Sequence, residues 1–168
     1  VVPISIKLSE PSELIFRINH SDSQFIFVSD NHKDKIRKII SSLPGIKNII
    51  IIGSDNKPAK GELFYHTLLS EGKQHIGEYA EELKKCMTSL TGDDLASISY
   101  TSGTTSDPKG IMLTHRNYTA NVEQANSLFN VPEWYVTLII LPWDHAFAHT
   151  VGLYTMISNG ASIAVVET

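Results

Sequence analysis

The sequence predicts an α/β fold, with layers of helices against mostly parallel strands. Short apolar runs typical of strands alternate along the chain with stretches whose apolar residues recur at helical spacing. Glycine, proline and small polar residues separate these segments. A strand–helix–strand succession needs crossover connections, and such connections join parallel strands. The 168 residues are enough to bury a core without disulfides or metals.

The first half of the chain is expected to begin strand, helix, strand, helix, strand. Residues 4–8 alternate apolar and polar side chains, as a half-buried strand does. Ser9 or Ser12 can cap the following helix, because Pro11 is tolerated in a first turn. The later segments are a buried strand over 25–28, a helix from Asp30 or Asn31 with Ile36, Ile39, Ile40 and Leu43 in its apolar stripe, and a strand over 48–52.

A polar loop over 54–61 and a third helix over 75–87 complete this half. Gly77 weakens that helix by about 1 kcal/mol relative to alanine. Its apolar residues recur at helical spacing, so they are expected to face inward: Ile76, Tyr79, Leu83 and Met87.

The second half follows the same alternation. Thr114 is a good N-cap for a helix whose apolar positions are Tyr118, Val122, Ala125 and Phe129. Strands are expected over 96–100, 111–113, 135–141 and 161–166, and a further helix over 147–158.

Charge and composition exclude several classes of function. The net charge of −4 disfavours duplex DNA or an anionic membrane as the main partner, because phosphate backbones are held by clustered lysine and arginine. The basic cluster over 33–38 is interpreted as the solvated face of its helix, and no nucleic-acid partner is expected. No apolar run reaches the roughly 18–20 residues that span a bilayer. Cys86 is the only cysteine, which fits a reducing, cytoplasmic location.

The segment from Thr101 to Gly110 carries most of the functional information. Between Thr101 and Ser106 stand five hydroxyl side chains and one glycine, and Lys109 follows. Glycine lets backbone N–H groups approach an anion, hydroxyls add donors, and lysine adds a compact positive charge. The pattern favours a phosphate-binding loop. A surface turn of similar composition remains the alternative.

This loop differs from the P-loop of nucleotide triphosphatases. Gly103 and Lys109 have the P-loop spacing, but Pro108 stands in place of the second glycine and Gly110 in place of the hydroxyl residue. Proline has no N–H to donate and cannot adopt positive φ. The loop must therefore bind phosphate in another way.

The longer string identifies a family. Residues 101–110, followed by Leu113-Thr114-His115-x-Asn117, closely resemble the signature of the adenylate-forming superfamily, which includes acyl-CoA synthetases, luciferases and the adenylation domains of peptide synthetases. The chain departs from the usual string at Ser106, where the family has glycine. The resemblance implies that the following residues contact the ATP phosphates and the departing pyrophosphate: Thr101, Ser102, Gly103, Thr104, Thr105, Ser106 and Lys109. It also implies that Thr101 reaches a Mg²⁺ shared with the phosphates.

A second motif follows an expected strand. Leu141-Pro142-Trp143-Asp144-His145 resembles the family's Leu-Pro-x-x-His segment, which implies that His145 borders the carboxylate being activated. Three other interpretations exist. His145 can be a half-buried residue that orients the turn, or it can form a zinc pair with His149 four residues later. A hydrolase triad with Asp144 is disfavoured, because the chain has no Gly-x-Ser-x-Gly elbow.

The resemblance extends over nearly the whole chain. Residues 18–21, 25–28, 43–45 and 93–96 are similar to the region that precedes this loop in long-chain acyl-CoA synthetases. The family's adenine motif, ribose-binding aspartate and C-terminal lysine have no match here. We therefore expect residues 1–168 to be one fragment of the large N-terminal domain, with strand–helix repeats over 1–90 and the loop and acyl-side segment over 91–168.

The resemblance implies that the parent protein uses ATP, Mg²⁺ and coenzyme A to convert a fatty acid into its acyl-CoA. Lys109 and His145 are its candidate catalytic residues in this segment. The fragment alone is expected to be inactive, and a peripheral membrane contact of the parent stays open. The alternatives are an adenylating enzyme for aromatic or amino acids, a non-catalytic nucleotide-binding module, and a purely structural α/β domain.

Overall fold

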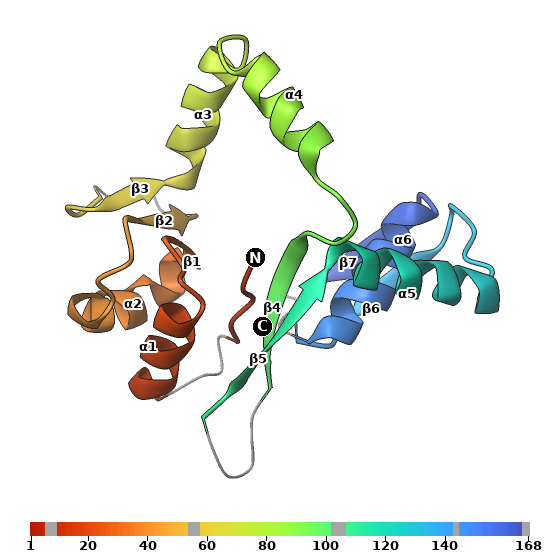
Figure 1. Cartoon of the computed structure of the whole chain (residues 1–168), viewed down its shortest axis with the longest axis horizontal. Helices are drawn as coiled ribbons and strands as arrows, with labels where there is room; N and C mark the ends of the chain where they lie inside the picture. Colours follow the sequence, from red (N-terminus) through yellow and green to blue (C-terminus); the bar gives the residue numbers. More distant parts are fainter. Residues whose placement is uncertain (6–9, 54–57, 102–106, 143–144, 166–168) are drawn as a thin grey trace. The chain divides into compact units, whose positions relative to one another are not determined.

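The computed structural model describes residues 1–5, 10–53, 58–101, 107–142 and 145–165. The chain divides into two compact units, Ile6–Leu90 and Val1–Ser5 with Thr91–Thr168 (Figure 1). Each unit combines helices with a parallel sheet, which confirms the α/β fold. Neither unit's described helices are both long and apolar enough to cross a membrane.

The unit Ile6–Leu90 is built on a three-stranded parallel sheet in the order β1-β2-β3. The central strand β2 is a run of isoleucines, and its middle three residues are buried. Parallel strands need a long crossover, which the helical segment between β1 and β2 supplies. The elements are α1 (Pro11–His20), β1 (Phe25–Ser29), η1 (Asp30–His32), α2 (Lys33–Ile39), η2 (Ile40–Ser42), β2 (Asn48–Ile52), β3 (Glu62–Phe64), α3 (Tyr65–His75) and α4 (Ala80–Ser89).

Three expectations for these first segments are corrected. The strand β1 is present, but it is not buried: Phe25 and Phe27 are 52% and 61% exposed. It lies at the edge of the sheet, where side chains alternate between a covered and an open face. Helix α1 begins after Glu10, so Ser12 lies inside the helix rather than at its cap, and Ser9 is outside the described residues. In the second helix Ile40 is 40% exposed, whereas the other three stripe residues are buried.

The expected helix over 75–87 is wrong. One helix, α3, ends at His75 and another, α4, begins at Ala80, with Gly77 in the break between them. The residues expected to face inward are exposed: Ile76, Tyr79, Leu83 and Met87. In Figure 1 the two helices diverge from their junction, so they do not cover each other's apolar faces.

Strand β3 is anchored by an ion pair that the sequence pattern did not reveal. The carboxylate of Glu62 is almost fully buried, and it accepts hydrogen bonds from Arg37 Nε at 2.6 Å and Arg37 Nη2 at 2.8 Å. The backbone N–H of Ala59 donates a third bond at 2.9 Å. The guanidinium holds the pKa of Glu62 below its usual value. This pair ties β3 to α2.

The second unit contains two separate pairs of strands. The antiparallel pair is β4 (Leu95–Thr101) with β5 (Lys109–Thr114), and the parallel pair is β6 (Val136–Ile139) with β7 (Ser162–Val165). The connection over 102–108 is shorter than the dozen or so residues that a parallel crossover needs, so β5 must return antiparallel to β4. The remaining elements are α5 (His115–Leu128), the π-helix η3 (Ala148–Tyr154) and α6 (Thr155–Ser158).

The first residues of the chain extend this unit rather than the other one. The backbone nitrogen of Val1 donates to Ala96 O at 2.9 Å, and Ile98 N donates to Val1 O at 2.9 Å. The expected strand over 4–8 does not begin at residues 4 and 5, and the rest of that range lies outside the described residues.

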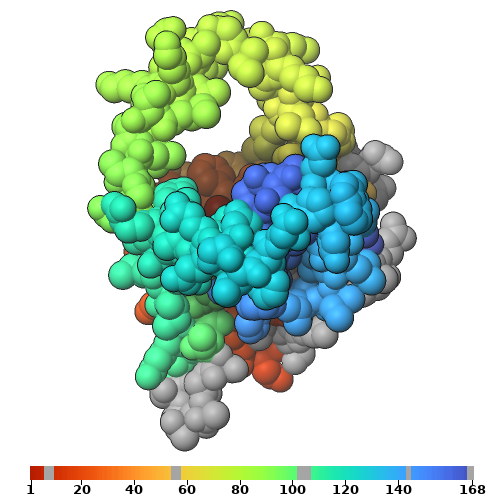
Figure 2. Space-filling model, turned by 90° about the vertical axis from the view of Figure 1, so that its right-hand side faces the viewer, coloured from red at the N-terminus to blue at the C-terminus, as the bar shows by residue number. Residues whose placement is uncertain are grey.

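Helix α5 packs along the helical segment η3–α6, as the teal and blue segments of Figure 2 show. The core beneath includes Ala125 of α5, Ile139 of β6 and Ala148 of η3. At Gly152 a methyl group would lie only 3.1 Å from Ile139, so the absence of a side chain lets η3 approach β6 closely.

Candidate functional site

The base of the predicted phosphate loop is well defined. Thr101 and Lys109 form the last cross-strand pair of β4 and β5, and both are exposed. The loop residues Ser102, Gly103, Thr104, Thr105 and Ser106 lie outside the described residues, so their predicted phosphate contacts stay predictions.

One face of the β4–β5 ribbon runs from this base toward helix α5. Cross-strand partners share a face, and residues two apart on a strand also share it. The pair Thr101–Lys109 therefore lies on the same face as the pair Ser97–Leu113. Lys109 and Leu113 are four residues apart, a distance of about 13 Å along the strand.

Helix α5 begins immediately after β5, through a capping box. Thr114 N donates to Asn117 Oδ1 at 2.8 Å, and Asn117 N donates to Thr114 Oγ1 at 3.3 Å. The predicted N-cap at Thr114 is thus confirmed. Arg116 adds a surface ion pair with Asp93, with Nε–Oδ1 at 2.8 Å, and this contact lowers the pKa of Asp93.

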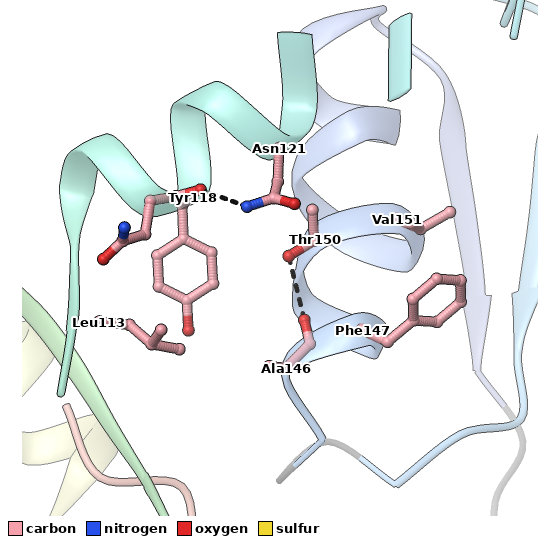
Figure 3. Close-up of a pocket in the computed structure, with 8 residues that line it drawn as sticks. Leu113, Tyr118, Asn121, Ala146, Phe147, Thr150 and Val151 are labelled. Carbon is pink, nitrogen blue, oxygen red and sulfur yellow. Dashed lines mark hydrogen bonds between the residues drawn. The ribbon is translucent and has the colours of Figure 1, made fainter. Parts of the chain in front are cut away.

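A pocket of about 280 Å³ opens between α5 and η3. In Figure 3, Tyr118 and Asn121 extend from α5 into the space beside the helix that carries Thr150, and the Tyr118 ring lies near Leu113. Apolar and polar side chains both line it, so it suits a ligand that is mostly apolar with a few polar atoms. The lining residues are Leu113, Asn117, Tyr118, Asn121, Ala146, Phe147, Thr150 and Val151.

Tyr118 is held in this pocket by a hydrogen bond and by ring contacts. Its hydroxyl shares a 2.7 Å hydrogen bond with the hydroxyl of the buried Ser97. Its ring packs edge-to-face on Tyr154 with centroids 5.2 Å apart, and the His149 ring lies 6.5 Å away. Burial raises the pKa of Tyr154.

The second wall of the pocket belongs to a π-helix, which was expected to be an ordinary helix. Thr155 Oγ1 donates to Thr150 O at 2.8 Å, five residues back, and Thr150 Oγ1 donates to Ala146 O at 3.1 Å. Such wide turns place side chains differently from an α-helix and occur often at functional sites. Here the turn includes two pocket residues, Thr150 and Val151.

His145 is exposed and stands just before this helix. Its Nδ1 accepts a hydrogen bond from the backbone N–H of Phe147 at 3.2 Å. An accepting Nδ1 carries no proton, so the neutral imidazole bears its proton on Nε2. This contact fits the interpretation that His145 orients the turn, but the side chain is exposed and not half-buried as that interpretation expected. The next two residues line the pocket. Trp143 and Asp144 of the motif lie outside the described residues.

The zinc interpretation gains no support. Within the described ranges, no group of three or more histidine, cysteine, aspartate or glutamate side chains could hold a metal ion. His149 instead lies beside the rings of Tyr118 and Tyr154. The triad interpretation depends on Asp144, which is outside the described residues.

Sequence reasoning missed most of the pocket. Tyr118 was expected only as an apolar position of its helix, and Asn121 and Thr150 were not singled out. A tyrosine on an inward helix face needs a polar partner for its hydroxyl, and that requirement is the one signal that could have pointed to Ser97.

Known proteins of similar sequence include long-chain acyl-CoA synthetases. A long-chain-fatty-acid–CoA ligase of Escherichia coli O157:H7 is 29% identical over 91% of this chain and 30% of its own length. The peroxisomal long chain acyl-CoA synthetase 7 of Arabidopsis thaliana is 31% identical over 67% of this chain and 16% of its own length. The chain thus spans less than a third of either relative.

Solved structures of similar fold include another CoA ligase. The crystal structure of an anthranilate CoA ligase in complex with anthranoyl-AMP matches with a TM-score of 0.79 at 23% identity, over 99% of this chain and 30% of that one. The sequence profile of the AMP-binding enzymes matches residues 1–168. The chain accordingly belongs to the AMP-binding enzyme family.

Proposed function

We propose that the full-length protein containing this chain is an ATP-dependent acyl-CoA synthetase. A fatty acid carboxylate attacks the α-phosphorus of ATP, and the bond to pyrophosphate breaks. The thiol of coenzyme A then attacks the acyl carbon of the acyl-AMP, loses its proton, and releases AMP. The long-chain ligases among the relatives support the choice of acid.

The observation that carries this proposal is the shared face of β5. Lys109 lies at the base of the predicted phosphate loop, and Leu113, on the same face of the same strand, lines the pocket. A reaction between a carboxylic acid and ATP needs the two substrates at neighbouring sites in a fixed orientation. The short strand β5 would hold the two sites at a fixed distance and orientation, because Lys109 and Leu113 are both part of it.

Lys109 is assigned to the phosphates of ATP. Its ammonium neutralises charge on the phosphate oxygens and on the departing pyrophosphate. Thr101 stands opposite and brings a hydroxyl oxygen to the same end of the ribbon. Oxygen is the ligand that Mg²⁺ prefers, and Mg²⁺ usually keeps waters and phosphate oxygens as well, so Thr101 fits as one contact. When bound, Mg²⁺ would neutralise negative charge on the phosphates of ATP. The residues over 102–106 add the remaining phosphate contacts in this proposal.

The pocket between α5 and η3 is assigned to the acyl group. Its lining is mostly apolar, and it adjoins the turn that begins at His145. With its proton on Nε2, His145 can donate a hydrogen bond to the carboxylate that enters from this side. We place the activity in the cytoplasm, because a low cysteine content, here the one exposed Cys86, fits a reducing compartment.

The test is acid-dependent ATP–pyrophosphate exchange by the full-length protein, with short, medium and long fatty acids beside aromatic and amino acids. We expect exchange with long fatty acids, and acyl-CoA once coenzyme A is added. Exchange with aromatic or amino acids alone would keep the adenylation step and reject the fatty acid. A protein that binds ATP and exchanges with no acid would be a non-catalytic nucleotide-binding module. The isolated chain of 168 residues is expected to give no exchange.

A further inference from the structure

A partly buried hydrogen bond, between a buried serine and a half-buried tyrosine, joins the β4–β5 ribbon to the pocket. The Oγ of Ser97 and the Oη of Tyr118 lie 2.7 Å apart, and only 5% of Ser97 is exposed. A buried hydroxyl that loses its partner is costly, so this bond fixes the distance between β4 and α5.

The two residues have distinct positions relative to the proposed substrates. Ser97 pairs across the ribbon with Leu113, a pocket residue, and it shares its face of β4 with Thr101. Tyr118 is itself part of the pocket wall, and its ring is braced by Tyr154. The bond therefore connects a side chain that would touch the acyl group to the strand that ends at the phosphate loop.

We propose that Tyr118 is a positioning residue that, through its hydrogen bond to Ser97, holds Thr101 and Lys109 in the orientation that adenylation requires. The inference rests on the proposed function. Tyr118 does not take part in bond making. Its hydroxyl sets where β4 lies relative to the pocket, and its ring forms part of the pocket wall.

The experiment compares ATP–pyrophosphate exchange by the full-length protein and three variants, Tyr118→Phe, Ser97→Ala and the double variant. Tyr118→Phe keeps the ring in the pocket and removes only the hydroxyl. We expect kcat to fall about three- to tenfold, the effect of one hydrogen bond, while the KM of the acid stays unchanged. Ser97→Ala should give the same loss, and the double variant should lose no more than either single one.

Thermal unfolding separates positioning from stability. Each single variant leaves one hydroxyl of the pair without its partner, so its Tm falls, whereas the double variant leaves two compatible apolar groups and regains Tm. If the bond only stabilises the fold, exchange recovers together with Tm in the double variant. If it positions the strand, exchange stays low although Tm recovers. The control is Tyr135→Phe, which removes the same atom from an exposed tyrosine outside the pocket and should leave exchange unchanged.

The outcomes are distinct. Low exchange by the double variant at restored Tm supports the inference. Exchange that recovers with Tm, or that never falls in Tyr118→Phe, overturns it while the proposed function stands. A wild-type protein without exchange for any acid overturns the proposed function and this inference together.

Discussion

Thr101 and Lys109 face each other as the terminal pair of the antiparallel β4–β5 ribbon. The predicted phosphate loop therefore starts and ends at one fixed point, and both flanking side chains project from one face of the ribbon. The ladder of backbone hydrogen bonds fixes where the backbone of Lys109 lies and from which face its side chain starts. In the proposed function, this placement keeps the lysine at the end of the ribbon where the phosphates would bind, which favours catalysis by preorganised charge.

Replacement of Lys109 by alanine should slow adenylation strongly. If Lys109 binds the phosphates as proposed, the variant loses the positive charge next to them, and we expect kcat/KM in ATP–pyrophosphate exchange to fall about 10- to 100-fold. The kcat/KM of Lys109→Arg should fall less, because arginine keeps the positive charge although it lacks the compact ammonium group. The matched control is Lys73→Ala, which removes an exposed lysine from α3. Equal rates for the Lys109→Ala and Lys73→Ala variants would remove Lys109 from the site.

Replacement of Gly110 by alanine should displace the neighbouring Lys109. A methyl group at Gly110 would lie 3.0 Å from Ile98 Cγ2 and 3.3 Å from the ring of Tyr100. Tyr100 is buried, so the strand rather than the ring must give way. We expect the KM for ATP to rise about tenfold, since small misplacements of binding groups are costly.

The control for this change is Gly72→Ala. Gly72 lies within α3, and a methyl group there meets nothing within 4 Å. This variant should keep the KM for ATP and gain up to about 1 kcal/mol of helix stability. A Gly110→Ala variant with an unchanged KM would show that β5 tolerates the shift.

The fold was predictable where local pattern and burial agree. The isoleucines of β2 form an uninterrupted apolar run, and they are buried at the centre of the sheet as such a run predicts. Thr114 had both the right side chain and the right place for an N-cap. Strand β3 was missed because its buried residue is the charged Glu62, whose ion-pair partner Arg37 lies 25 residues earlier in the chain. No local pattern encodes such a partner.

The candidate site was predictable only where its residues are contiguous in the sequence. The loop signature is contiguous, so Thr101 and Lys109 could be chosen from the sequence, and the structure pairs them. The pocket is built from β5, α5 and a π-helix, and its side chains become neighbours only through packing. The bond between Ser97 and Tyr118 spans 21 residues, and neither residue belongs to a recognisable motif.

The pair of Arg37 and Glu62 predicts a pH-dependent contribution to stability. Because the folded-state pKa of Glu62 is lowered, the stabilisation is complete above the unfolded-state pKa and is lost as the pH falls through the folded-state value. Glu62→Gln should therefore lower the urea midpoint at pH 7, and the difference from wild type should shrink below about pH 4.5.

Glu71→Gln is the matched control for this pH dependence, since it neutralises an exposed carboxylate on α3 of the same unit. Its urea midpoint should follow the wild type across the same pH range. If the urea midpoint of Glu62→Gln lies below that of the wild type by the same amount from pH 3 to pH 7, the ionised carboxylate is not the source of the stabilisation.

The capping box at the start of α5 connects stability to the pocket. Thr114→Ala removes the acceptor for Asn117 N, and the loss of such a cap costs about 1 kcal/mol. Because Tyr118 lies in the first turn of α5, fraying there also loosens a pocket wall, so the KM for the acid should rise while the KM for ATP stays nearly constant. Thr114→Ser keeps the hydroxyl and should match the wild type in both the urea midpoint and the KM for the acid. If Thr114→Ala lowers the midpoint but leaves the KM for the acid unchanged, the first turn of α5 is not part of the acid site, and the pocket must be assigned to another ligand.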